Sequence, residues 1–143
     1  MSAQGRCNCG KFAFEVPPLQ GIAICHCKPC TRAGGSIGSF NAVIPADGIT
    51  FTKGSLKELG NYQDTETSSG NPMARHFCAS CGSAIISIPK DSPIGFFKVS
   101  SLDDAQAYIG RDRKPDQVIF QSRAPDFVKK LDWGEGVKTA SEG

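Results

Sequence analysis

Short runs of alternating apolar and polar residues recur along the chain. Phe12, Phe14 and Val16 share one face of a predicted strand, which Pro17 and Pro18 end. Further strands are predicted at residues 22–25, 37–44, 49–52, 56–62, 73–77, 85–88, 96–99 and 118–120. Many short strands with turn residues between them predict an all-β fold.

Little of the chain has a helical pattern. Residues 102–108 and 125–131 predict one helical turn each, and the second has Pro at its first position. Residues 31–35 contain Gly34 and Gly35 and predict a loop. We expect Met1–Gly5 and Val137–Gly143 to be flexible ends.

Composition narrows the class of protein. The chain has 143 residues, which predicts one domain over 1–143. Its apolar runs are too short to span a bilayer, and its first residues lack the apolar stretch of a secretory signal. We therefore expect a cytoplasmic protein without a membrane partner, where disulfides are rare. The formal charge of +2 would become slightly negative if the cysteines bound zinc as thiolates, so charge does not favour a nucleic-acid partner.

Seven cysteines fall into three clusters, and their spacing is typical of metal sites. The clusters are Cys7 and Cys9, then Cys25, Cys27 and Cys30, then Cys78 and Cys81. A Cys-x-x-Cys turn points two thiolates at one metal ion, and Gly82 suits the turn that follows Cys81. In an extended Cys-x-Cys segment, both thiols share a face, so His26 would point away from the metal.

Spacing leaves two groupings open. The two Cys-x-x-Cys turns could together form a zinc ribbon from Cys27, Cys30, Cys78 and Cys81, although the insertion between the turns is long for a ribbon. The other grouping joins the first and last clusters into a closed four-thiolate site. It leaves the middle cluster as a three-thiolate site, uses every cysteine and is therefore favoured.

Other interpretations of the cysteines remain open. Both zinc sites could be structural, with a fourth ligand for the middle cluster from His76, a carboxylate or water. Buried apolar cysteines and disulfides fit the clustering and the odd cysteine count less well.

Three blocks of the chain resemble a known family. Cys7-Asn8-Cys9-Gly10, residues 25–30 and residues 75–82 are similar to the three cysteine blocks of the glutathione-dependent formaldehyde-activating family, which includes centromere protein V. Leu102-Asp103-Asp104 and residues 119–125 also resemble family motifs. The resemblance covers nearly the whole chain in order.

The resemblance implies a fold, metals and an activity. It implies a β-tent of coiled antiparallel sheets with two zinc ions, the second the more labile. The structural zinc would be held by Cys7, Cys9, Cys78 and Cys81, and the site linked to activity would consist of Cys25, Cys27 and Cys30. The implied activity is that of a carbon–sulfur lyase, and the founding reaction joins glutathione and formaldehyde into S-hydroxymethylglutathione.

These expectations define a catalytic hypothesis with two rivals. A substrate sulfur would occupy the fourth position at the three-cysteine zinc and would be activated as a thiolate. Lys28, Arg32 or Arg75 could steer an anionic, glutathione-like thiol. The first rival is a non-catalytic, zinc-stabilised binding module with two structural zinc sites. The second is a redox or zinc sensor that uses the three thiols of the middle cluster.

Overall fold

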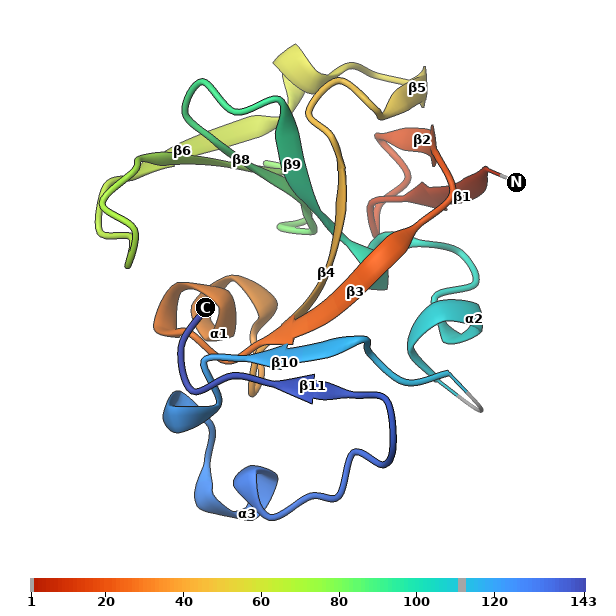
Figure 1. The fold of residues 1–143 in the computed structure, drawn as a ribbon. Coiled ribbons are helices and arrows are strands. Elements are labelled where there is room, and N and C mark those ends of the chain that lie inside the picture. Colours follow the sequence, from red (N-terminus) through yellow and green to blue (C-terminus); the bar gives the residue numbers. More distant parts are fainter. Residues whose placement is uncertain (1, 111–112) are drawn as a thin grey trace.

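Two β-sheets form the framework of the protein (Figure 1). The computed structural model describes residues 2–110 and 113–143, and Met1 lies outside the described residues. The smaller sheet has the order β1-β2-β5 and contains β1 (Ala3–Arg6), β2 (Ala13–Val16) and β5 (Thr50–Lys53). Its strands are antiparallel, and β2 is the central one.

The larger sheet carries most of the remaining strands. Its order is β11-β10-β3-β4-β9-β8-β7-β6. The strands are β3 (Gln20–Cys25), β4 (Ser39–Pro45), β6 (Gly60–Asp64), β7 (Met73–Phe77), β8 (Ala84–Pro89), β9 (Ile94–Lys98), β10 (Gln117–Ile119) and β11 (Lys138–Thr139). Strand β10 runs parallel to β3. From β3 through β4, β9, β8 and β7 to β6, each strand is antiparallel to the next one in the sheet. The predicted mostly β fold is confirmed.

Aromatic and branched side chains fill the space between the two sheets. The predicted face of β2 is buried, because Phe14 and Val16 are each 1% exposed. The Phe14 ring meets the rings of Phe51 and Phe97 edge to face, with 5.9 Å between centroids in each pair. The core thus joins the small sheet to the centre of the large one.

Helices are short and lie in the connections. They are α1 (Lys28–Gly34), α2 (Gln106–Ile109) and α3 (Asp126–Lys129), with 3-10 turns at Leu56–Glu58, Val99–Ser101 and Gln121–Arg123. No helix in the described ranges is both long and apolar enough to cross a membrane.

Helix α1 corrects the prediction of a loop at residues 31–35. Cys27 is the N-cap, Pro29 lies in the first turn, and Gly35 ends the helix with a left-handed φ of 63°. Pro near the start and Gly just past the end are the ordinary boundaries of a helix. Of the two glycines, only Gly35 interrupts the helix, so the predicted loop at residues 31–35 is wrong.

Two further expectations about local structure differ from what is observed. The predicted strand at residues 56–62 begins instead with the 3-10 turn, and β6 follows it. Both chain ends carry strands where flexible ends are expected: β1 pairs with β2, and β11 pairs with β10. Backbone hydrogen bonds to a neighbouring strand hold these segments despite their polar side chains.

Candidate metal centre

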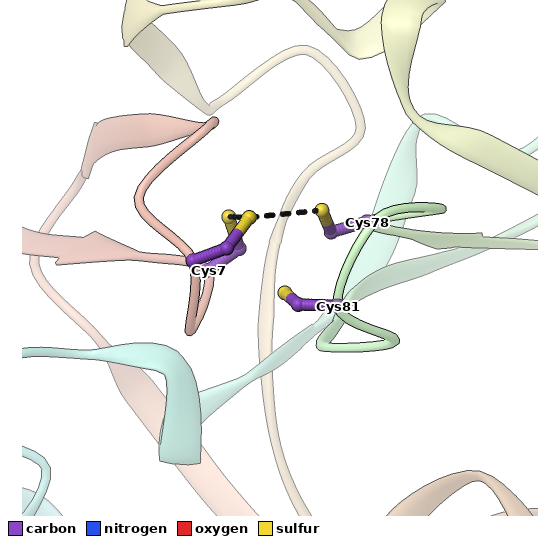
Figure 2. A group of neighbouring side chains, drawn as sticks. Cys7, Cys78 and Cys81 are labelled. Carbon is purple, nitrogen blue, oxygen red and sulfur yellow. Dashed lines mark hydrogen bonds between the residues drawn. The ribbon is translucent and has the colours of Figure 1, made fainter.

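The first and last cysteine clusters meet at one point. Cys7 and Cys9 lie in the loop between β1 and β2, and Cys78 and Cys81 lie in the turn between β7 and β8. Their four sulfurs lie within 4.8 Å of one another, and Figure 2 shows the Cys7, Cys78 and Cys81 side chains directed towards a common centre. The Cys7–Cys9 and Cys9–Cys78 sulfur distances are 3.7 and 3.8 Å.

Tight backbone turns direct these sulfurs inwards. Gly10 and Gly82 adopt φ values of 75° and 80°, which residues with a side chain rarely adopt. The Gly10 N–H donates to the Cys7 carbonyl, and the Gly82 N–H donates to the Cys78 carbonyl. The Cys-x-Cys segment therefore turns at Gly10, and the Cys-x-x-Cys segment turns at Gly82, so that both direct their sulfurs inwards.

Hydrogen bonds favour the thiolate form at two of the four sulfurs. The Phe12 backbone N–H lies 3.3 Å from the Cys7 sulfur. The Ser83 side chain and backbone lower the pKa of Cys81 to about 5. A backbone hydrogen bond at Lys11 lowers the pKa of Cys9, but burial and contacts with the other three sulfurs outweigh it and raise that pKa to about 11. Four converging thiols fit a tetrahedral zinc ion.

The middle cluster forms a second group of sulfurs at the junction of β3 and α1. Cys25 ends β3, Cys27 caps α1, and Cys30 lies in the first turn of the helix. Their sulfurs lie within 4.8 Å of one another, and those of Cys25 and Cys27 are 3.3 Å apart. Hydrogen bonds with Cys25 and Cys27 lower the pKa of Cys30, whereas hydrogen bonds with Cys27 and Cys30 raise the pKa of Cys25. Cys30 is therefore the thiol of this group with the lowered pKa.

This second group has three ligands and no fourth one within residues 2–110 and 113–143. No histidine or carboxylate joins the three cysteines there. The cysteines are buried, with exposed fractions of 4%, 9% and 7% in chain order, and Ile119 and Phe120 pack against them. Three soft donors in an apolar surrounding fit a zinc ion whose fourth position is left for another molecule.

A polar group beside the three cysteines was not found from the sequence. Lys98 is 4% exposed, and its Nζ donates to the Asn41 side-chain oxygen at 2.7 Å. The Asn41 side-chain nitrogen in turn lies 3.9 Å from the Cys30 sulfur, and the Ser39 hydroxyl donates to Asn41. Nothing in the local pattern of residues 96–99 distinguishes Lys98 from a solvated lysine.

The two histidines lie outside both sulfur groups. The His26 side chain is buried, and its Nδ1 lies 2.7 Å from the Ile37 carbonyl oxygen, as suits a structural role. His76 is half-buried on β7, and burial lowers its pKa. Neither supplies a ligand atom to the sulfur groups in the described chain.

The basic residues named from the sequence lie on α1 and β7, and two of them, Arg32 and Arg75, border one cavity. Lys28 and Arg32 are exposed on α1. Arg75 binds Asp64 at 2.8 Å, and both side chains are largely buried. Arg75 is therefore already paired, whereas the first two face solvent.

Two cavities meet at Lys98. The larger has a volume of about 520 Å³ and is lined by Cys7, Ser83, Ser39 and Lys98, among others. The smaller, of about 300 Å³, is lined by Arg32, Arg75, His76 and Lys98, among others. Ala33, Gly82, Ala84 and Lys98 border both. Cys25, Cys27 and Cys30 line neither cavity, but Ser39 and Lys98 border the larger one and both contact Asn41, whose side-chain nitrogen lies 3.9 Å from the Cys30 sulfur.

The fold and the two sulfur groups define a mostly β domain with two cysteine clusters that could each hold a metal ion. The chain matches the glutathione-dependent formaldehyde-activating enzyme family over residues 2–123, and it belongs to that family. The resemblance found in the cysteine blocks is thereby confirmed.

Comparison with solved structures supports the fold. The chain is similar to the crystal structure of a Rhodobacter sphaeroides protein, with a TM-score of 0.56 and 18% sequence identity. The match covers 96% of this chain and 99% of that one. A comparison with curated protein sequences gave no match.

Proposed function

We propose that the protein is a zinc-dependent carbon–sulfur lyase that acts on a thiol–aldehyde adduct such as S-hydroxymethylglutathione. The observation that carries this proposal is the group of three buried cysteines to which the described chain adds no fourth ligand. The family description, an enzyme that activates formaldehyde with glutathione, supports the choice of reactants.

The two sulfur groups would have different tasks. Cys7, Cys9, Cys78 and Cys81 would hold a structural zinc, because four thiolates complete a tetrahedral site. Cys25, Cys27 and Cys30 would hold the second zinc. When bound there, zinc supplies an open coordination position that favours the thiolate form of a thiol.

The residues around the second group suit thiol chemistry. Ile119 and Phe120 exclude water from one side of the three cysteines. Phe120 holds a φ of 54°, an unusual conformation for a residue with a bulky side chain, and packs there nonetheless. The two cavities bordered by Lys98, about 520 and 300 Å³, have room for a peptide-sized thiol.

The reaction makes or breaks one carbon–sulfur bond. In the forward direction, the thiolate electron pair forms the bond to the aldehyde carbon, and the carbonyl π pair moves onto oxygen. That oxygen takes a proton from water, and the thiol has released one on ionising, so the net reaction joins a thiol and an aldehyde into a hemithioacetal. In the reverse direction, the bond pair returns to sulfur.

Seven free cysteines, five of them buried, suit a reducing compartment, and we place the protein in the cytoplasm. Its partner would be a small thiol or thiol adduct rather than a nucleic acid or a membrane.

The test is acceleration of adduct exchange. Glutathione and ¹³C-formaldehyde form S-hydroxymethylglutathione in solution, and exchange NMR measures the rate with and without protein. Wild-type protein with two zinc ions should raise the exchange rate, whereas Cys27→Ser should leave it at the spontaneous value. Lys57→Gln, at an exposed position far from both groups in sequence, serves as the control that keeps the activity.

An exchange rate equal to the spontaneous one, from folded protein with both zinc ions, would contradict the proposal. It would favour the zinc-stabilised binding module instead.

A further inference from the structure

Lys98 is a buried ammonium without an acidic partner. Its exposed fraction is 4%, and its Nζ donates to the neutral Asn41 side chain. Among the residues that the structure describes, the ion pairs are Arg75–Asp64, Arg123–Glu142 and Lys129–Asp126, and none includes Lys98. Because burying an ammonium is costly unless opposite charge lies near, its position calls for a negatively charged neighbour.

The three-cysteine group is that neighbour. The Asn41 side chain contacts both Lys98 and the Cys30 sulfur, so one amide separates the ammonium from the thiols. Burial lowers the pKa of Lys98, and the attraction of Cys30 opposes this effect. An ammonium at Lys98 and thiolates at the three cysteines would attract each other across the single Asn41 amide.

Lys98 also faces the space where a substrate would lie. It borders both the 520 Å³ and the 300 Å³ cavity, and Asn41 takes one of its three N–H donors. The Asn41 contact fixes the direction of the ammonium, since the same amide is held by the Ser39 hydroxyl. A donor fixed in this way is suited to bind an oxygen atom close to a sulfur at the three cysteines.

We propose that Lys98 donates a hydrogen bond to the carbonyl-derived oxygen of the thiol adduct, beside the three-cysteine group. The inference rests on the proposed function and adds the residue that recognises the oxygen end of the adduct. When the carbon–sulfur bond forms, negative charge develops on that oxygen, and the ammonium stabilises it until water delivers the proton. The lysine keeps its own proton throughout.

The competing role for Lys98 is purely to offset the charge of the thiolates. In that role, the lysine affects the metal site but does not distinguish an adduct with a hydroxyl group from one without. The experiment therefore compares two stable thioethers of equal length, S-(2-hydroxyethyl)glutathione and S-propylglutathione, which exchange a hydroxyl for a methyl group.

Binding of both thioethers to zinc-loaded protein is measured by calorimetry, after the zinc content of each variant has been determined. Wild-type protein should bind the hydroxyethyl compound about tenfold more tightly, as a hydrogen bond to a charged donor would give. Lys98→Met should remove this preference, and Lys98→Arg should retain part of it because it keeps a charged donor. Lys57→Met, which alters an exposed lysine, should behave as wild type.

A second measurement needs no substitution at Lys98. In wild-type protein labelled with ¹⁵N-lysine, the buried ammonium signal should shift on addition of the hydroxyethyl compound and not of the propyl compound. This measurement decides the question if Lys98→Met does not fold.

The outcomes separate the two proposals. Two results would overturn the role of Lys98 and leave the proposed function standing. One is that Lys98→Met binds both thioethers with the wild-type preference. The other is that wild-type protein binds both with equal affinity and shows no shift of the ammonium signal. Failure of zinc-loaded wild type to bind either thioether would overturn the proposed function and, with it, the role of Lys98.

Discussion

The sulfurs of Cys9 and Cys78 lie 3.8 Å apart, although 69 positions separate them in the chain. One is in a loop of the small sheet and the other in a turn of the large sheet. A metal ion at this point would therefore tie the two sheets together. Because the unfolded chain binds the metal ion more weakly than the folded chain does, metal binding stabilises the folded state.

Replacement of Cys78 by Ser should remove one zinc ion and destabilise the whole domain. The expected loss is a large part of the about 10–16 kcal/mol that structural zinc sites contribute, enough to prevent folding at 37 °C. Zinc content by mass spectrometry and thermal unfolding by circular dichroism measure it. A variant that melts like wild type would show that this group holds no structural metal.

Replacement of Cys27 by Ser should remove one zinc ion while the fold persists. The three cysteines lie at the end of β3 and the start of α1, so their metal joins neighbouring segments of chain rather than distant ones. We expect loss of exchange activity with a fall in unfolding free energy of about 1–3 kcal/mol. A chelator should likewise remove this zinc before the other, because three protein ligands hold it instead of four. Complete unfolding of Cys27→Ser would assign the second zinc a structural role.

The buried ion pair between Arg75 and Asp64 should be important for stability. The two groups are 2.8 Å apart, and their side chains are 14% and 8% exposed. Arg75→Met would leave the buried Asp64 carboxylate without a charged partner and with the Glu66 backbone N–H as its remaining donor, at a cost of about 3 kcal/mol in chemical denaturation. The matched control is Arg123→Met, which breaks a pair of exposed side chains and should cost less than about 1 kcal/mol. Similar losses in both variants would contradict the prediction.

Gly82 should tolerate Asn better than Ala. Its φ of 80° strains any residue with a side chain, and a Cβ there would meet open space. Gly82→Ala should therefore cost about 1–2 kcal/mol through backbone strain alone, and Gly82→Asn less, because Asn visits the left-handed region more readily. Urea denaturation of the zinc-loaded variants measures both. Equal stability of the Ala variant and wild type would show that the turn can relax.

The sequence by itself determined many of the strands and the cysteine pairs. Phe12, Phe14 and Val16 alternate with polar residues, and this period of two is a local property that survives in any β arrangement. Likewise, Cys-x-Cys and Cys-x-x-Cys bring two thiols together through a few backbone angles. The mostly β fold and the family could therefore be recognised without coordinates.

Local sequence patterns do not predict the structure where the same residue types are compatible with two kinds of element. Gly34 and Gly35 indicated a loop, but tertiary context let α1 continue to Gly34. The strand at the C-terminal end was missed because Lys138 and Thr139 form it by pairing with β10 rather than through apolar side chains. Pairing with a strand that is distant in sequence cannot be recognised from a short stretch of neighbouring residues.

Only the tertiary structure decided what surrounds the cysteines. Spacing favours the grouping of the first and last clusters but leaves the ribbon open. The loop after β1 and the turn after β7 meet because the two sheets pack on one core, and this brings the favoured grouping together. Lys98 is paired with Asn41 across β9 and β4, and this register brings its buried ammonium to the Asn41 side chain. Burial is a property of the assembled sheet, and the identity of a lysine carries no information about it.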